Sequence, residues 1–371
     1  MKLTDVVDRI NGNVDRFTTE LEYYIGGEHF ESNELEVTQK GLLKENLGKL
    51  GFKFHFAFQD RDVVFMARNP HLRKAGMVRF AGLCSDASYI LRSKDETVLS
   101  QEYLAVMLQS DHFWDYCESH KVGSVNFANN WSSIANYEFE LPTPEEQKEI
   151  SDQVWAAYRL KQSYKKLLAA TEEMVKSQFI EMFGNPVANN KGWNTMAIKQ
   201  VAPEEPSRER QTGTVWILNL DMIESHTGKI IDKVYDEDTN LLSVAPFDEG
   251  NVLYSKLRPY LNKVVIPKGK GYATTELVPL RPNQEYLNLT FFSYLLRGDD
   301  FVTYANTISS GTKMPRMPLN DLRNFQCILP PMEEQLKFEK VAEQADKSEF
   351  ELRKSIEAID QVIKSLINDI K

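Results

Sequence analysis

The sequence has little of what secreted, membrane-spanning or metal-binding proteins depend on. Its 371 residues include only three cysteines, Cys84, Cys117 and Cys327, which stand far apart and have no pair of histidines nearby. This spacing argues against a disulfide framework and against a zinc site, and it predicts reduced core cysteines in a cytoplasmic protein. No apolar run approaches the roughly 18 residues of a membrane-spanning helix, and residues 1–17 lack the apolar core of a signal peptide.

Motifs of common catalytic sites are missing as well. The sequence contains no Asn/Asp-Pro-Pro-Tyr/Phe motif for methyl transfer to an amino group, no Gly-x-x-x-x-Gly-Lys-Ser/Thr phosphate loop and no His-Glu-x-x-His metal helix. Glu146 and Lys148 have the spacing found at the end of some nuclease motifs, but helix capping explains Glu146 more simply. We therefore expect a chain that has no catalytic residues and binds no cofactor or metal itself.

Charge is unevenly distributed along the chain. The net charge of −10 disfavours nonspecific binding along nucleic acid. Residues 61–92 nevertheless contain six basic and two acidic groups, and residues 250–282 contain six basic groups and one acidic group. With 42% hydrophobic residues, the chain can also bury proper cores. We expect two folded domains, each with a local concentration of positive charge.

Residues 142–186 are predicted to form one long helix whose two ends are marked. Thr143 can cap the start, Pro144 fits the first helical position, and Glu146 completes a capping box. Gly184, with a proline two residues later, ends the helix. The apolar residues in between recur at steps of three and four, so the helix has one apolar stripe that needs a partner.

A second long helix is predicted over residues 331–371, and it repeats the first. The motif Leu-Pro-x-x-Glu-Glu-Gln occurs at 141–147 and again at 329–335, which is 188 positions later. The apolar residues of the second helix alternate in steps of three and four, which is typical of a coiled coil. We expect the two helices to form an antiparallel coiled coil within one chain; a rod that only dimerises is the alternative.

Two globular segments, 1–141 and 187–330, precede the two helices and also repeat each other. A strand followed by a basic loop that contains proline occurs at 62–74 and again at 251–263. A helical segment and a polar loop follow in both halves. We interpret the chain as an internal duplication of a globular domain plus a long helix. The early parts align poorly, as expected if the two domains bind different targets.

In this order and spacing the sequence resembles the specificity (S) subunits of type I restriction-modification systems. The resemblance is carried by the two Leu-Pro-x-x-Glu-Glu-Gln motifs, the run at 176–186 and the repeated strand-loop pairs. It implies an α+β protein with two mixed α/β target recognition domains in pseudo-twofold repeat, separated by two long helices that form an antiparallel coiled coil. Each domain would read one half of a bipartite DNA sequence.

The resemblance also implies partners. These are double-stranded DNA, modification (M) methyltransferase subunits, two for each S subunit, and restriction (R) subunits, with no membrane. S-adenosylmethionine would bind to the M subunit, and ATP and magnesium to the R subunit.

The DNA-binding residues are expected in the basic loops and in the polar loops that begin at Gly123 and Gly311. Arginine can bond guanine, asparagine can bond adenine, and lysine mostly holds phosphates. The candidates are Arg68, His71, Arg73, Lys74, Asn126 and Asn129 in the first domain, and Lys256, Arg258, Tyr260, Asn262, Lys263, Lys313 and Arg316 in the second. The alternative is that Pro70 and Pro259 mark fixed turns with solvated basic neighbours.

We therefore expect a non-catalytic DNA-recognition subunit of a type I restriction-modification complex. A specificity subunit of a type IIB-like or other phage-defence methylation system is an alternative of the same class. A coiled-coil scaffold whose globular ends bind proteins is an alternative of a different class, and a cryptic nuclease is the least favoured.

Overall fold

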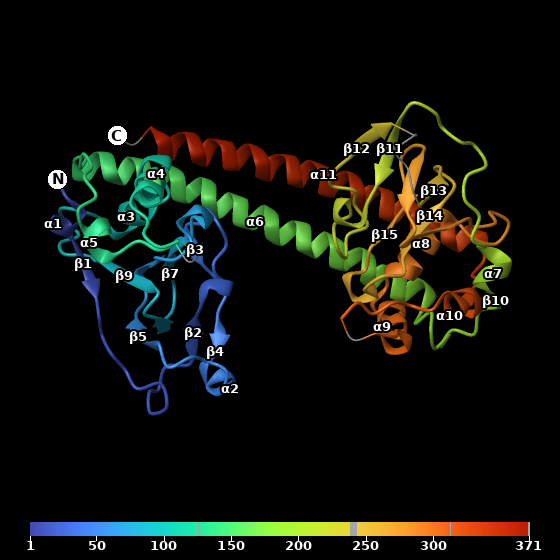
Figure 1. Ribbon diagram of the computed structural model, residues 1–371, viewed down its shortest axis with the longest axis horizontal. Helices are drawn as coiled ribbons and strands as arrows, with labels where there is room; N and C mark the ends of the chain where they lie inside the picture. Colours follow the sequence, from blue (N-terminus) through green and yellow to red (C-terminus); the bar gives the residue numbers. More distant parts are fainter. Residues whose placement is uncertain (125–126, 238–242, 312, 370–371) are drawn as a thin grey trace. The chain divides into compact units, whose positions relative to one another are not determined.

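The computed structural model describes residues 1–124, 127–237, 243–311 and 313–369 of the chain. It divides into two compact units: unit 1 comprises residues 1–166 and 353–371, and unit 2 comprises residues 167–352. Each unit contains an α/β globular part and segments of two long helices (Figure 1). The predicted α+β class, with two mixed α/β domains, is confirmed.

The two long helices are α6 (Pro144–Phe183) and α11 (Met332–Asn368). At the start of α6 the predicted capping box is present: Thr143 N donates to Glu146 Oε2 at 2.8 Å, and Glu146 N donates to Thr143 Oγ1 at 3.3 Å. At its end Gly184 has φ +74° and donates its N–H to Ile180 O at 2.8 Å. Both ends of α6 therefore follow from local sequence signals.

The long helices pack on each other inside each unit. In unit 1, Val154 of α6 shares a buried core with Ile363 and Ile367 of α11. In unit 2, the rings of Phe179 of α6 and Phe338 of α11 meet edge to face, with centroids 5.3 Å apart. The first half of α6 thus packs on the last part of α11, and the last half of α6 on the first part of α11. This is the predicted antiparallel arrangement.

The globular part of unit 1 contains two sheets. Its strands are β1 (Val7–Ile10), β2 (Tyr23–Ile25), β3 (Glu36–Val37), β4 (Gly41–Leu42), β5 (Phe54–Phe58), β6 (Val63–Met66), β7 (Ala75–Val78), β8 (Gly82–Ser85) and β9 (Ser88–Ser93). Its helices are α1 (Leu3–Val6), α2 (Leu43–Asn46), α3 (Gln101–Met107), α4 (Asp111–Ser119) and α5 (Trp131–Ala135), with short 3₁₀ turns η1 (Gly27–His29) and η2 (Pro70–Leu72). The sheet orders are β1-β9-β6-β7-β3 and β4-β2-β8-β5. Central β6 is buried on both faces.

The globular part of unit 2 repeats this topology. Its strands are β10 (Thr195–Ala197), β11 (Thr214–Leu218), β12 (Val234–Glu237), β13 (Val244–Phe247), β14 (Val252–Ser255), β15 (Val264–Val265), β16 (Gly271–Thr274), β17 (Leu277–Leu280) and β18 (Gln326–Ile328). Its helices are α7 (Ile198–Val201), α8 (Leu289–Arg297), α9 (Asp299–Ile308) and α10 (Leu319–Asn324), with 3₁₀ turns η3 (Leu220–Met222) and η5 (Pro259–Leu261). The orders β15-β14-β17 and β12-β11-β16-β13 match β7-β6-β9 and β4-β2-β8-β5.

The match includes the direction of the strands. In both small sheets the second and third strands are parallel, β2 with β8 and β11 with β16, and the outer strands are antiparallel to them. The early parts of the two segments, which align poorly in sequence, therefore have the same fold. The internal duplication extends across both globular parts.

The structure also bears on the cysteines, on membrane-spanning helices and on metal sites. Cys84, Cys117 and Cys327 are buried and unpaired, as predicted for core residues, and burial raises the pKa of the Cys84 thiol to about 12. Among the described residues, no helix is long and apolar enough to cross a membrane. The same residues contain no cluster of three or more His, Cys, Asp or Glu side chains that could hold a metal ion.

Candidate nucleic-acid interface

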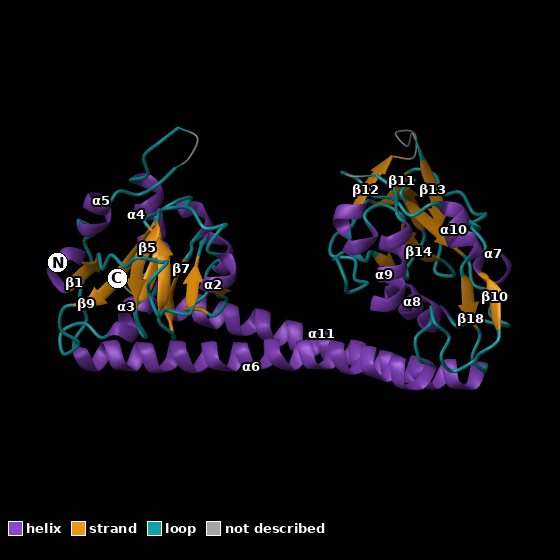
Figure 2. Cartoon of the chain, turned by 90° about the horizontal axis from the view of Figure 1, so that it is seen from below, coloured by secondary structure: helices purple, strands orange, loops and turns teal. Residues whose placement is uncertain are grey.

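In unit 1 the structure brings the basic loop after β6 against the polar loop before α5. Asn69 N donates to Phe127 O at 2.9 Å, and Asn129 N donates to Ala67 O at 2.8 Å. Arg68 and Ala128 form the antiparallel bridge between these two bonds. The loops are separated in sequence by β7, β8, β9, α3 and α4, so only the tertiary structure places them together. Figure 2 shows α5, which follows the polar loop, on the side of the globular part that faces away from α6.

Unit 2 builds the same pair of loops. Arg258 N donates to Pro315 O at 2.7 Å, and Met317 N donates to Lys256 O at 2.9 Å. Leu257 and Arg316 form the bridge between them. Main-chain hydrogen bonds therefore preserve this feature in both units although the side chains differ.

The basic loops also share an unusual backbone conformation. Each contains a 3₁₀ turn, η2 or η5, between two residues in the left-handed region: Asn69 and Arg73 have φ 53° and 49°, and Arg258 and Asn262 have φ 49° and 48°. A left-handed conformation is unfavourable for residues other than glycine, so surrounding contacts must hold it. The prolines at the start of η2 and η5 do mark fixed turns, as the sequence suggested.

Two predicted residues of unit 1 are available for a ligand. Arg68 and His71 are exposed, and their side chains have no hydrogen bond or ion pair with any residue that the structure describes. Arginine at the edge of a loop, without an acidic partner, can donate two parallel hydrogen bonds to a guanine edge or to a phosphate. Asn126 lies outside the described residues.

Three other predicted residues of unit 1 have partners within the fold. Arg73 forms an ion pair with Asp111 of α4, and its hydrogen bond is the main cause that lowers the pKa of that carboxyl. Lys74 Nζ donates to Gly27 O at 2.7 Å. Asn129 is only 1% exposed, and its Nδ2 donates to Cys117 O at 2.7 Å. The amide of Asn129 is therefore held inside the fold, and its contact with DNA stays a prediction.

In unit 2 the available side chains are those of Lys256, Tyr260 and Lys313. Tyr260 is 45% exposed and Lys313 is also exposed. None of the three side chains has a hydrogen bond or an ion pair with the described part of the chain. Arg258 is half-buried, and its Nε is buried and has no hydrogen-bond partner among the described residues.

The other candidates in unit 2 are engaged. Asn262 is 5% exposed and its Nδ2 donates to Arg297 O at 2.8 Å, so its side chain too is held inside the fold, and its contact with DNA stays a prediction. Lys263 Nζ donates to Leu220 O at 2.6 Å, as Lys74 does to a carbonyl in unit 1. Arg316 is exposed and bonded to Glu276 at 2.9 Å. This arginine would have to exchange that carboxylate for a ligand.

The sequence reasoning missed one cation near the loops of unit 1. The Arg9 guanidinium lies 4.4 Å from the ring centre of Tyr89 and 5.8 Å from that of Trp131. Tyr89 in turn donates its O–H to Asn129 O at 2.8 Å, which places Arg9 close to the polar loop. Stacking on aromatic faces fixes the guanidinium without neutralising it. No local pattern around Arg9 indicates this, because its partners come from distant segments.

Comparisons with known proteins agree with this architecture. Residues 190–361 match the family of type I restriction modification DNA specificity domains. The type I restriction enzyme EcoDI specificity subunit of Escherichia coli is 28% identical over 150 residues, which are 39% of this chain. The match spans only about a third of that relative, 33% of its length.

Two solved structures share the fold over the whole chain. The S subunit of the type I restriction-modification system from M. genitalium matches with a TM-score of 0.57 at 11% identity, covering 100% of this chain and 95% of its own. A chain from work on complex assembly and conformational transition of the type I system matches with a TM-score of 0.56 at 17% identity, covering 100% and 96%. Residues 190–361 are thus similar to the DNA specificity domain of type I restriction-modification systems, and the whole chain shares the fold of these two solved structures.

Proposed function

We propose that this chain is the sequence-specific DNA-recognition subunit of a type I restriction-modification complex. Each globular part would read one half of a bipartite target. The observation that carries the proposal is the loop pair that is built twice, with corresponding main-chain hydrogen bonds and with left-handed residues at the same two positions. The backbone of the two loop pairs is the same, but their exposed side chains differ. This is what we expect of two domains that bind different base sequences.

The candidate side chains have the chemistry that DNA requires. Arg68 and Arg258 are suited to reading guanine, and Lys256 and Lys313 to holding phosphates. His71, Tyr260, Arg316 and Asn126 remain candidate contacts, to which we add Arg9. In this proposal Arg73, Lys74 and Lys263 hold the loops in place.

Catalysis would belong to the partners. We propose that two M methyltransferase subunits dock on each S subunit and bind S-adenosylmethionine, and that R subunits bind ATP and magnesium. The chain itself would supply the recognition surface and the connection between its two readers.

The test is to map methylated positions in DNA after the chain is expressed with its M subunit. We expect one recognition sequence in two parts, separated by positions at which any base is accepted. The purified chain alone should transfer no methyl group. A single uninterrupted sequence, or methylation that does not depend on this chain, would contradict the proposal and would favour a coiled-coil scaffold.

A further inference from the structure

Each long helix carries a buried glutamine in its first turn. These are Gln147 of α6 and Gln335 of α11, which are 1% and 0% exposed. They are the last residues of the two Leu-Pro-x-x-Glu-Glu-Gln motifs. Neither lies in the loops assigned to DNA reading. Burying an amide is unfavourable unless its hydrogen bonds are satisfied, so their partners should explain why they are there.

The side chain of Gln147 joins α6 to the segment that leads into α3. Its Oε1 accepts from Ser100 N at 3.0 Å. Its Nε2 donates to Val98 O at 2.8 Å and to Pro142 O at 2.9 Å. One amide therefore holds the globular part and the approach to α6 together, with both N–H groups used.

Gln335 makes the same three bonds in unit 2. Its Oε1 accepts from Asn288 N at 2.8 Å, and its Nε2 donates to Tyr286 O at 2.9 Å and to Pro330 O at 2.8 Å. Each partner lies 188 positions after its counterpart in unit 1. Two of the three partners differ in residue type between the units. The contact survives these differences because the glutamine binds only main-chain atoms.

The glutamines also accept a hydrogen bond from the N–H of the N-cap residue of α3 or α8, which has no such partner within its own helix. Ser100 and Asn288 are the N-cap residues of α3 and α8, and their side chains accept from Tyr103 N and Phe291 N at 3.2 and 3.1 Å. In a capping box, a Glu or Gln at this third position would return a bond to the N–H of the cap residue. Aromatic residues stand there instead, and the glutamine of the long helix supplies the acceptor.

We propose that Gln147 and Gln335 are positioning residues that fix the direction in which each long helix leaves its globular part. The inference rests on the proposed function in one respect: this direction would set the gap between half-sites that the complex accepts. Because α6 has 40 residues, a small change in its direction at one end moves the other end by a large distance. A tilt of about 10° moves its far end by roughly 10 Å, because a helix rises about 1.5 Å per residue. That displacement is about three base-pair steps.

The test uses Gln147→Met and Gln335→Met, separately, in the full chain with its M subunit. Methionine keeps the length of the side chain but supplies no amide donor or acceptor. Gln153→Met and Gln344→Met are matched controls, since both glutamines are exposed on the same helices. Methylation is measured on DNA with both half-sites and a gap that is native, one base pair shorter or one base pair longer.

We expect the preference for the native gap to fall by about fivefold or more in each buried-site variant, because a fixed set of buried hydrogen bonds is lost. The bases preferred within each half-site should not change, and the controls should behave as wild type. A variant that merely loses stability would methylate all three substrates less and keep their ratio. That result would overturn the positioning role.

Hydrogen exchange of the free protein gives a readout that does not involve DNA. Gln147→Met should speed exchange of the Ser100 amide by about tenfold or more and leave the Asn288 amide unchanged, and Gln335→Met should do the reverse. Faster exchange with an unchanged gap preference would overturn the positioning role while DNA recognition stands. A wild-type complex without any gapped target would overturn both.

If the methionine variants do not fold, Gln147→Glu takes their place. Its carboxylate can still accept from Ser100 N but cannot donate to Val98 O or Pro142 O when ionised. We expect an intermediate loss of gap preference. A gap preference equal to that of wild type would contradict the proposal.

Discussion

Each unit has an ion pair between a long helix and the globular part, but the two charges are exchanged. The helix residue is the cation in unit 1 and the anion in unit 2. In unit 1, Lys161 of α6 lies 2.8 Å from Glu34. The corresponding helix position in unit 2, 188 residues later, is Glu349 of α11, which pairs with Lys229. The two helix side chains are similarly buried, at 6% and 7% exposed. An ion pair remains attractive when its two charges are exchanged. The two units can therefore carry opposite charges at this helix position and keep the same backbone around it.

The frame around this pair is the same in both units. Asn33 and His226 are left-handed, with φ 58° and 69°, and their N–H groups donate to Arg73 O and Asn262 O at 3.1 and 3.2 Å. The next carbonyl accepts a side-chain bond in each case, from Gln109 in unit 1 and from Arg297 in unit 2. Main-chain geometry is therefore held constant while side-chain charge varies.

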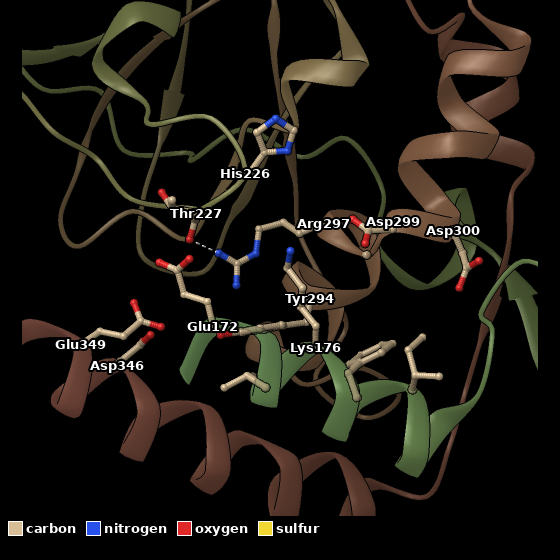
Figure 3. A pocket seen from close by; sticks show the side chains of 14 residues that line it. Glu172, Lys176, His226, Thr227, Tyr294, Arg297, Asp299, Asp300, Asp346 and Glu349 are labelled. Atoms are coloured by element: carbon tan, nitrogen blue, oxygen red, sulfur yellow. Dashed lines mark hydrogen bonds between the residues drawn. The ribbon is translucent and has the colours of Figure 1, made fainter. Parts of the chain in front are cut away.

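Figure 3 shows this region of unit 2. Arg297 reaches Thr227 beside a cavity of about 250 Å³, with Glu172 on α6 and Asp346 and Glu349 on α11. The cavity of unit 1 at the corresponding place is lined instead by several cations, namely Arg73, Lys161, Lys165 and Lys364, together with Glu34, Asp111 and Asp360. Corresponding places in the repeat thus have different charge.

The difference has a consequence for assembly of the chain. A globular part that docked on the wrong helix segment would bring Glu34 against Glu349, or Lys229 against Lys161. Like charges in a buried contact are strongly unfavourable. We expect the exchanged charges to help each globular part select its own helix segment during folding.

The largest effect is expected from reversing one charge. Glu349→Lys would face Lys229 inside unit 2 and should lower its free energy of unfolding by about 3–5 kcal/mol, as breaking a buried pair does. Denaturant unfolding measures this. The double variant Lys229→Glu/Glu349→Lys, which has the polarity of unit 1, should regain most of the loss, and Glu343→Lys on the exposed face of α11 should have little effect. Failure of the double variant to recover would show that the charges are not interchangeable.

In unit 1, the loss of stability caused by replacing Glu34 with a neutral residue should depend on pH. Burial alone would raise the pKa of Glu34, but hydrogen bonds and charge from Lys161 and Lys165 bring it below its ordinary value. A lowered pKa means that the ionised carboxylate stabilises the fold above the unfolded pKa, and that this is lost as pH falls through the folded pKa.

Glu34→Gln should therefore cost unit 1 about 1.5–3 kcal/mol at pH 7, the range for hydrogen bonds to charged groups. The difference from wild type should shrink below about pH 4, where glutamate begins to take up a proton. Unfolding curves at several pH values measure it, with exposed Glu20→Gln as the control. A difference that is independent of pH would assign the loss to packing.

The two basic loops should act on separate half-sites. Arg68→Ala should weaken recognition in one half-site, and Arg258→Ala in the other, by about 1–3 kcal/mol each if they read bases. Binding to DNA variants in each half-site, with the M subunit present, measures this. Exposed Arg159→Ala on α6 is the control. An equal loss on all sequences, with a weaker salt dependence, would make the residue a phosphate contact instead.

The smallest effect concerns the helix starts, where the two units also differ. Thr143 caps α6, whereas Pro331 stands at the matching position before α11, and Glu334 N donates to its carbonyl at 3.0 Å. Thr143→Ala should destabilise unit 1 by about 1 kcal/mol. Pro331→Thr should stabilise unit 2 slightly by adding the missing side-chain cap. Thermal unfolding of both variants would show whether the two starts are equivalent.

The features that the sequence determined by itself are those set by neighbouring residues. Both ends of α6 were predictable because Thr143, Glu146 and Gly184 bind atoms within one helical turn. The duplication was predictable because its spacing is constant, and the turns at Pro70 and Pro259 because proline restricts its own backbone. These signals also carry the resemblance to the specificity subunits.

Only the tertiary structure decided which charged and polar groups are free. Lys74 and Lys263 have the composition of a DNA-binding loop, yet their ammonium groups bind carbonyls 47 and 43 residues away in sequence. Gln147 stands in a recognisable motif, but its partner Ser100 is 47 residues away. A residue type states what a side chain can bond. Whether that bond is already made depends on segments that folding brings from elsewhere in the chain, and no local pattern records them.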